Sequence, residues 1–348
     1  MTFQISSLKS EETIFSLTDI YKISYFINEK AEKENINLFI VVGDKSIESL
    51  VIITALLISK KDFLVTTQQV FCKINFAEKN IKIHVFDNKY DYKKFFRDIR
   101  ITYLNTNFSN SKLRDALSNC FKNVDRKIYY SSSGSTGLPK LIPINSNMLY
   151  NSHKKVIDII KNNNSLRNIL CIHSTSFVIS LNYIMIALLL EIRIVSILPL
   201  NFLSLISKIK SIGNQSILIT VPSMLDAIKN YLIKTDYLKL HTIISCGEPL
   251  KISVAEKIIS SSVNGFYNFY GATEYATWVF CSKINNSLIE KLKEINSVYI
   301  PLGSPMKDIN YFINESNELY VSSNHMTNSY LDNNLNKYDA RKLLQNNK

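Results

Sequence analysis

A stretch rich in small hydroxyl side chains, residues 128–144, holds the residues best suited to chemistry. Gly134 and Gly137 allow positive φ angles, so successive backbone N–H groups can point into one concavity that suits an anion. Pro139 restricts the exit of this loop, and Lys140 places one compact positive charge beside it. Five neighbours supply hydroxyl donors: Ser131, Ser132, Ser133, Ser135 and Thr136. We expect the loop to hold nucleotide phosphates; the alternative is an ordinary Ser/Gly-rich surface loop, against which the apolar runs on both sides argue.

A second informative run, residues 268–274, ends an apolar, strand-like segment. Tyr270 offers an aromatic ring that can stack on a purine, and Gly271 lets the backbone approach a ligand closely. Thr273 can hydrogen-bond a phosphate oxygen, while the Glu274 carboxylate is a hard oxygen ligand for Mg²⁺. Taken alone, the run fits an ordinary turn equally well.

Together the two runs resemble the signatures of the adenylate-forming (AMP-binding) superfamily, which includes acyl-CoA synthetases, aryl-acid ligases and peptide-synthetase adenylation domains. Ser-Gly-Ser-Thr-Gly-Leu-Pro-Lys resembles its phosphate loop, which differs from Walker A, and Tyr-Gly-Ala-Thr-Glu resembles its Tyr-Gly-x-Thr-Glu motif. The resemblance implies that Tyr270 packs on adenine with Asn268 beside it, and that Thr273 contacts the α-phosphate. It implies catalytic roles for Lys140, Thr273 and Glu274, with Glu274 as the Mg²⁺ ligand. The ATP-binding residues that it implies are Ser132, Ser133, Gly134, Ser135, Thr136, Gly137, Lys140, Gly247, Glu248, Asn268, Tyr270, Gly271 and Thr273.

Further matches extend the resemblance from about residue 17 to about residue 333. The run 245–250, Ser-Cys-Gly-Glu-Pro-Leu, is similar to the family's Ser-Gly-Gly-Glu-x-Leu, whose backbone borders the adenine and the acyl pocket. Cys246 replaces a usual glycine, and without a histidine at suitable spacing we expect a small wall residue rather than a nucleophile. The family's Ile-Gly-x-Pro, Gly-Glu-Leu-x-Val and Gly-Tyr sequences resemble residues 301–305, 317–321 and 329–331.

Phe177 and Val178 indicate the substrate class. They belong to a stretch that resembles the Phe-Asp-x-Ser stretch of amino-acid-activating relatives. In those relatives the aspartate holds the α-ammonium group of the substrate. An apolar Val178 would leave a buried ammonium unpaired, which costs several kcal/mol. We therefore expect a carboxylic acid without an α-amino group, contacted by Phe177, Val178 and Gly271; an amino acid is the alternative.

The resemblance implies AMP-forming activation of the acid with MgATP, followed by transfer to a thiol of CoA or of an acyl or peptidyl carrier protein. Relatives continue with an aspartate that binds the ribose, a hinge and a mobile C-terminal domain carrying a second lysine. We find no counterpart before Lys348, and Asp339 lacks the Thr-Gly-Asp context. We therefore expect slow adenylation by this chain alone. The alternatives are a degenerate nucleotide-binding or interaction protein, and an amino-acid adenylation subunit whose C-terminal domain is a separate chain.

The amino-acid composition limits the class, the partners and the cellular compartment expected for the protein. The 348 residues suffice for two or more compact units, and 46% of them are hydrophobic, as in globular proteins. The net charge of +12 comes from scattered lysines without a nucleic-acid motif, so we expect no nucleic-acid partner, whereas an acidic carrier protein is compatible. Five cysteines without a Cys-x-x-Cys pair predict reduced thiols in the cytoplasm: Cys72, Cys120, Cys171, Cys246 and Cys281. The first 19 residues lack the apolar run of a signal sequence.

Alternating apolar runs predict an α/β fold with doubly wound, largely parallel sheets in two packed subdomains, plus a small β-rich region. Predicted strands cover 38–42, 63–66, 82–86, 101–104, 127–130, 169–172, 193–198, 216–221, 242–245 and 265–269. Predicted helices cover 17–34, 47–59, 111–122, 145–162, 201–211, 224–232 and 254–260, with Ser46 and Ser223 as caps. We assign 1–298 to the α/β core, 299–332 to the β-rich region with strands at 299–300, 310–313 and 318–322, and 333–348 to a polar tail without further elements.

The segment Ile169–Leu190 contains no charged side chain and is long enough to cross a membrane. Several serine, threonine and asparagine residues interrupt it. We therefore interpret it as a strand, a loop and a buried helix that ends at Glu191, and expect no membrane partner.

Overall fold

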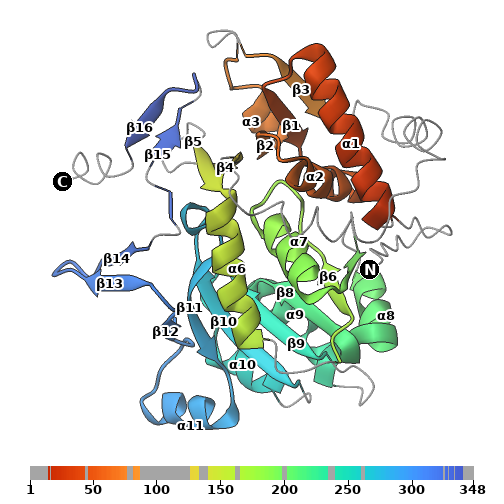
Figure 1. Cartoon of the computed structure of the whole chain (residues 1–348). Helices are drawn as coiled ribbons and strands as arrows, with labels where there is room; N and C mark the ends of the chain where they lie inside the picture. Colours follow the sequence, from red (N-terminus) through yellow and green to blue (C-terminus); the bar gives the residue numbers. More distant parts are fainter. Residues whose placement is uncertain are drawn as a thin grey trace.

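The structure is a computed structural model that describes residues 15, 17–43, 46–76, 81–86, 126–132, 140–160, 165–197, 202–233, 240–259, 263–323, 326–327, 329–332 and 334–339. In this part of the chain, helices and strands alternate and build two seven-stranded sheets and a separate two-stranded hairpin (Figure 1). The predicted α/β class with two largely parallel sheets is confirmed. The strand expected at 101–104 and the helix expected at 111–122 lie outside the described residues.

The first sheet has the order β16-β15-β5-β4-β2-β1-β3. Its parallel part consists of β1 (Leu38–Val42), β2 (Phe63–Thr66), β3 (Ile83–Phe86) and β4 (Lys127–Ser132). Three antiparallel strands extend it: β5 (Lys140–Asn145), β15 (Ser329–Leu331) and β16 (Lys337–Asp339). The C-terminal part of the chain therefore returns to the sheet that the N-terminal part began.

The second sheet has the order β12-β11-β10-β9-β8-β6-β7. Five strands run parallel: β6 (Asn168–Cys171), β7 (Arg193–Ser196), β8 (Ser216–Thr220), β9 (Thr242–Cys246) and β10 (Gly265–Gly271). Two antiparallel strands, β11 (Trp278–Lys283) and β12 (Ser304–Pro305), close one edge. The hairpin is formed by β13 (Asn310–Ile313) and β14 (Leu319–Ser322).

The helices cover the faces of the sheets. They are α1 (Leu17–Glu34), α2 (Ile47–Ser59), α3 (Gln68–Phe71), α6 (Ser146–Ile160), α7 (Ile179–Leu190), α8 (Phe202–Ile212), α9 (Pro222–Ile233), α10 (Ile252–Ile259) and α11 (Asn286–Glu294). As predicted, Ser46 caps α2: its hydroxyl accepts the Ser49 N–H at 3.2 Å. Helix α7 ends at Glu191, whose left-handed conformation (φ 56°) stops the helix as expected.

Side-chain alternation explains why both faces of each sheet are covered. In β1, Phe39 and Val41 join the core between the sheets, while Leu38, Ile40 and Val42 join the core on the outer face. In β8, Ile217 and Ile219 point to the central core and Leu218 to the core under α8, α9 and α10. Because successive side chains of a strand point to opposite faces, such uniformly apolar strands belong inside a layered α/β structure.

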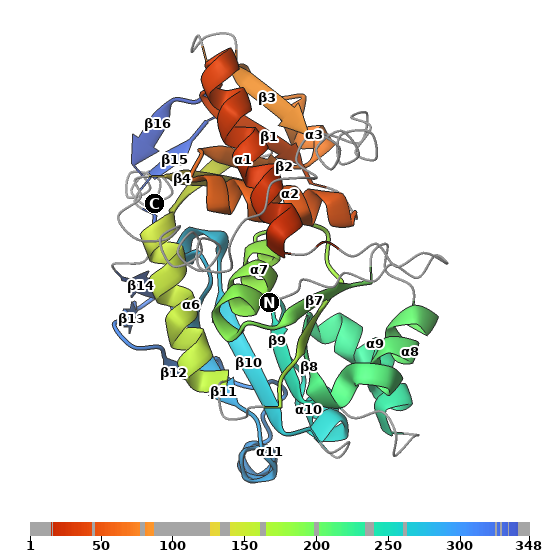
Figure 2. The ribbon, with the colours of Figure 1, turned by 45° about the vertical axis from the view of Figure 1, so that its right-hand side comes forward.

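Helices α2 and α7 lie together between the two halves of the molecule (Figures 1 and 2). In α2 every residue except Glu48 is buried, and α7 forms the second half of the charge-free run noted in the sequence. Two buried hydroxyl pairs cross this apolar interface: Ser49 Oγ lies 2.8 Å from Thr175 Oγ1, and Tyr130 Oη lies 2.7 Å from Ser180 Oγ. Among the described helices, none is long and apolar enough to cross a membrane.

Four local differences from the sequence interpretation have physical reasons. Helix α11 was not predicted; Asn285 caps it by accepting the Leu288 N–H at 2.8 Å. Residues 299–300 form no strand; Tyr299 makes only an isolated bridge to Lys251. Helix α9 begins at Pro222, one of the residues that favour a first turn, so Ser223 lies inside it and does not cap it. Strand β16 lies within the segment expected to be a polar tail without further elements. It forms there because its backbone pairs with β15, although its own sequence does not indicate a strand.

We predict that Arg126→Met lowers the free energy of unfolding by about 2–3 kcal/mol. Arg126 is buried, and its guanidinium donates to the carbonyl oxygens of Leu56 (3.4 Å) and Leu57 in the last turn of α2, where carbonyl groups lack backbone N–H partners within the helix. The Leu56 oxygen also accepts the Ser59 hydroxyl at 3.0 Å. Urea unfolding measures the change. The neighbouring exposed residue supplies a matched control, Lys127→Met, which should change stability by less than about 0.5 kcal/mol; equal effects of the two variants would contradict the capping role.

Candidate functional site

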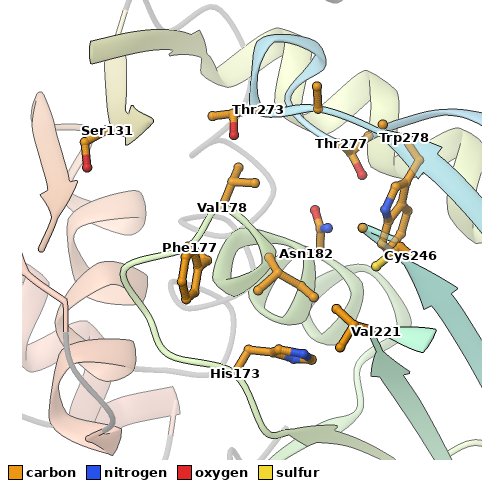
Figure 3. Close-up of a pocket in the computed structure, with 14 residues that line it drawn as sticks. Ser131, His173, Phe177, Val178, Asn182, Val221, Cys246, Thr273, Thr277 and Trp278 are labelled. Carbon is orange, nitrogen blue, oxygen red and sulfur yellow. The ribbon is translucent and has the colours of Figure 1, made fainter. Parts of the chain in front are cut away.

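A pocket of about 420 Å³ opens where strands of the second sheet end, beside the beginning of α7 (Figure 3). Ligand sites of parallel α/β sheets lie at these carboxyl ends. The segment from β6 into α7 contributes His173, Phe177, Val178, Ile179 and Asn182. The ends of β4, β8, β9 and β10 and the turn into β11 contribute Ser131, Val221, Cys246, Gly247, Gly271, Ala272, Thr273, Thr277 and Trp278.

The wall of this pocket is apolar and uncharged. Phe177, Val178 and Val221 face Trp278 across it (Figure 3). Among its lining residues in the described chain there is no Asp, Glu, Lys or Arg. Such a wall favours an apolar ligand body, oriented by a small number of neutral hydrogen-bonding groups.

Two histidines beside the pocket are neutral near pH 7. His153 is fully buried, with Nδ1 2.8 Å from the Leu149 carbonyl oxygen and Nε2 2.9 Å from the Asn182 side-chain amide. Burial lowers the pKa of His153 to about 4, and the hydrogen bond to the Leu149 carbonyl oxygen opposes this shift. His173 lies 2.6 Å from the Tyr183 hydroxyl through Nδ1, and burial lowers its pKa to about 4 as well. Both rings therefore act as uncharged hydrogen-bonding groups.

Cys246 is a wall residue, as expected, and its chemistry is suppressed. Burial raises the pKa of its thiol to about 12, although a hydrogen bond from the Trp278 side chain opposes the shift. A protonated thiol is a poor nucleophile. The four cysteines of the described chain, Cys72, Cys171, Cys246 and Cys281, are free thiols.

The two charged residues predicted for the nucleotide site approach the same side chain. Tyr330, in β15, donates its hydroxyl hydrogen to Glu274 Oε1 at 3.1 Å. Lys140 Nζ lies 5.7 Å from the centre of the Tyr330 ring, within cation–π range. The backbone of the Glu274 turn is also anchored, because its carbonyl oxygen accepts the Thr327 N–H at 2.8 Å. Strands β5 and β15 thus bring Lys140 and Glu274 to one place.

The end of β10 has a backbone that a larger residue would disturb. A Cβ on Gly271 would lie 2.1 Å from the Thr277 carbonyl oxygen, so only glycine permits the turn into β11 without a shift. This turn places Gly271 and Thr273 on the pocket wall. Tyr270 keeps a partly exposed ring 6.2 Å from Phe280, and buried Asn268 donates its side-chain amide to the Pro301 carbonyl oxygen at 3.4 Å.

The other predicted site residues divide into three groups. Phe177, Val178 and Gly247 line the pocket with Gly271 and Thr273. Glu248 lies outside the pocket lining and accepts the Ser223 N–H and hydroxyl at 3.0 and 3.1 Å, at the start of α9. Ser132 belongs to β4, where its backbone pairs with Lys140. The remaining loop residues, Ser133, Gly134, Ser135, Thr136 and Gly137, lie outside the described residues.

Sequence reasoning missed Asn182, His153 and Tyr330 as site residues. Asn182 lies one turn after Val178 on the same face of α7, so the helical repeat could have placed it in the pocket. His153 gave no such signal, because it meets Asn182 through the packing of α6 on α7. Tyr330 meets Glu274 only because β15 joins the first sheet, a pairing that local sequence does not predict.

Comparison with known protein families gives one match. The sequence pattern of one family, described as AMP-binding enzyme, matches residues 125–331. No individually curated protein matches the chain significantly in sequence.

Three solved structures illustrate the likeness in fold. The adenylation domain AlmE of Vibrio cholerae, in complex with glycyl-adenosine-5′-phosphate, is 14% identical with a TM-score of 0.67, and the match covers 94% of this chain and 67% of AlmE. The N-terminal subdomain of Klebsiella oxytoca NpsA with 3-hydroxybenzoyl-AMSN is 13% identical (TM-score 0.68; 94% and 86% covered). O-succinylbenzoate CoA synthetase (MenE) of Bacillus subtilis, with ATP and magnesium, is 13% identical (TM-score 0.66; 94% and 70% covered).

We predict that His153 makes the protein less stable as the pH falls from about 6.5 to 4. The pKa of His153 is lowered to about 4 by burial, so in this window the unfolded chain binds a proton that the folded chain does not. The stability difference between parent and His153→Gln should therefore shift in favour of the variant by about 1.4 kcal/mol per pH unit. Urea unfolding at pH 7 and pH 5 measures it, and a difference independent of pH would contradict a neutral buried imidazole.

Proposed function

The chain belongs to the AMP-binding enzyme family, and on this premise we propose that it activates a carboxylic acid with MgATP to an acyl-adenylate. The observation that carries the proposal is the meeting of Lys140 and Glu274 at Tyr330, close to an uncharged pocket. One lysine and one carboxylate at this position suit the phosphates and the metal of a single nucleotide. The apolar pocket suits the acid.

In the proposed reaction, a carboxylate oxygen of the acid attacks the α-phosphorus of ATP. The bond from this phosphorus to the bridging oxygen of the β-phosphate breaks, and pyrophosphate leaves with the bonding electrons. Lys140 stabilises the phosphates, Thr273 hydrogen-bonds the α-phosphate, and the loop that includes Ser132, Ser133, Gly134, Ser135, Thr136 and Gly137 holds the leaving group. No protein nucleophile is needed, because catalysis consists of positioning and charge neutralisation.

Glu274 fits the role of Mg²⁺ ligand. Its Oε1 accepts from Tyr330, while Oε2 has no hydrogen-bond partner among the described residues and can serve as a metal ligand. Mg²⁺ is commonly held by one or two carboxylates together with phosphate oxygens, so one glutamate suffices. When bound, the ion would supply positive charge between phosphate oxygens as pyrophosphate leaves.

The adenine is assigned to the end of β10 in this proposal. Tyr270 would pack on the base with its partly exposed ring, and Asn268, Gly247 and Glu248 would border it. Glu248 would act through its backbone, since both carboxylate oxygens are occupied by Ser223.

We further propose an acid without an α-amino group. Val178 stands on the pocket wall beside Phe177 and Gly271, and the described lining offers no carboxylate to pair with a substrate ammonium. A thiol of CoA or of a carrier protein would then attack the acyl carbon, releasing AMP and a proton. The MenE structures are described as a CoA synthetase and one NpsA structure as a fusion to a PCP domain, so both acceptors have precedent in proteins of this fold. The free thiols of the described chain suit a cytoplasmic setting.

The rival function is nucleotide binding without turnover, in which Lys140 and Glu274 hold ATP but no pyrophosphate forms. A panel of carboxylic acids, tested for pyrophosphate release with the chain alone and with candidate partner domains, separates the two. Acid-dependent release supports the enzyme. Binding of ATP without release under every condition supports the rival.

We predict that Glu274→Gln abolishes Mg²⁺-dependent, acid-dependent pyrophosphate release, because the amide cannot replace a charged metal ligand. The matched control is Glu256→Gln: this exposed residue on α10 pairs with Lys293, far from the pocket lining, and its loss should leave the rate unchanged. Equal rates in Glu274→Gln and its parent would remove the proposed metal role.

Tyr330→Phe should weaken the apparent affinity for Mg²⁺ roughly tenfold, since it removes a charge-assisted hydrogen bond that fixes the Glu274 carboxylate. The phenyl ring keeps the contact with Lys140, so binding of ATP without Mg²⁺ should change less than twofold. Titration of pyrophosphate release with Mg²⁺ measures the effect. An unchanged Mg²⁺ dependence would show that Tyr330 does not position Glu274.

A further inference from the structure

The pocket contains a buried amide whose orientation is set from outside the pocket. Asn182, in α7, is only 3% exposed and lines the cavity, and its amide stands in the open part of the pocket (Figure 3). His153, in α6, is inaccessible to solvent and contacts this amide from behind. The nature of the contact decides which polar atom of Asn182 the pocket presents to a ligand.

The hydrogen bonds of His153 fix its tautomer. Nδ1 lies 2.8 Å from the Leu149 carbonyl oxygen, which can only accept, so Nδ1 carries the proton. The imidazole is neutral, because burial lowers its pKa to about 4. Nε2 therefore has a lone pair and needs a donor.

The Asn182 amide must supply that donor. The position occupied by Asn182 Oδ1 lies 2.9 Å from His153 Nε2, and two acceptors at this distance would repel each other. The oxygen and nitrogen of a side-chain amide have nearly the same shape, so hydrogen bonding decides which one faces a partner. With the NH₂ group turned to Nε2, the carbonyl oxygen faces the pocket, where no described residue donates to it.

A second acceptor lines the same pocket. The Tyr183 hydroxyl donates its hydrogen to the Ile219 carbonyl oxygen at 3.1 Å, so its oxygen accepts from His173 Nδ1 at 2.6 Å. Nε2 of the neutral His173 is then an acceptor, and it has no partner among the described residues. The Thr277 hydroxyl, also in the lining, is buried and likewise lacks a partner in the described chain.

From this arrangement we propose that the acid activated here carries a neutral hydrogen-bond donor, a hydroxyl or uncharged arylamine, on an apolar framework, and that Asn182 binds this donor through a carbonyl oxygen oriented by His153. The proposal rests on the proposed function, since it names the class of acid for that pocket. A buried carbonyl left without a donor costs about 1–3 kcal/mol, so the acid that lacks the donor should bind less well. Asn182 determines specificity, and His153 is a positioning residue.

Calorimetric binding of matched acids to the full chain tests the proposal without turnover. The pairs are the three hydroxybenzoates against benzoate, and hydroxyhexanoates against hexanoate. At least one hydroxylated acid should bind tenfold or more tightly than its parent. Asn182→Leu should remove this preference while the parent acid still binds, and His153→Phe should reduce the same ratio. Lys154→Ala, at an exposed position beside His153 on α6, is the matched control and should leave the ratio unchanged.

The tautomer is tested separately by ¹⁵N NMR of histidine-labelled protein, which should show His153 Nε2 as an unprotonated nitrogen near pH 7. A protonated Nε2, or hydroxylated acids that bind no better than their parents, would overturn the proposal. Preference in binding without pyrophosphate release, both with the chain alone and with candidate partner domains, would support the proposal and reject the proposed function. Pyrophosphate release that is equal for hydroxylated and parent acids would support the proposed function and reject the proposal about Asn182. The comparison of hydroxylated with parent acids uses the unmodified protein. It therefore tests the proposal even if Asn182→Leu does not fold.

Discussion

The structure depends on the apolar interface in which α2 and α7 join the two sheets. Each helix is buried on nearly all sides, and together they form one continuous core with strands from both halves. Inside that core, a hydroxyl is favoured where it finds a partner, because an unpaired hydroxyl in an apolar setting costs several kcal/mol. The pairs Ser49–Thr175 and Tyr130–Ser180 meet this requirement only in one register of the two halves. The same register places the end of β4 beside the beginning of α7, which is where the pocket lies.

The fold could be predicted from the sequence because its signals are local. The apolar residues 38–42 and 217–219 predict strands buried on both faces, and Ser46 marks the start of α2. Helix α11 escaped prediction because its polar face resembles the surrounding loops, although Asn285 offered a capping signal. Strands β15 and β16 could not be predicted from local sequence, since β15 forms by pairing with β5, almost two hundred residues earlier in the chain, and β16 forms by pairing with β15.

The candidate site was predictable to the same extent. Lys140 and Glu274 each belong to a motif that is one short continuous stretch of sequence. The residue types of each motif could therefore be interpreted without a structure. Tyr330 contacts both of these residues, and His153 contacts Asn182 on the pocket wall; both contacts join elements that are distant in sequence. From sequence alone, Val178 indicates that the pocket has no carboxylate at that position. The polar groups that the pocket does contain, Asn182 and His173, become visible only in the structure.

Trp278, on the wall of the pocket, also determines the fluorescence of the protein. It is the only tryptophan of the chain, it lines the pocket, and its indole N–H faces the sulfur of Cys246. Tryptophan emission responds to the polarity of its surroundings and is quenched by nearby thiols. When tryptophan alone is excited, the fluorescence of the protein therefore originates at the wall of this pocket, and the molecule carries its own optical probe of occupancy.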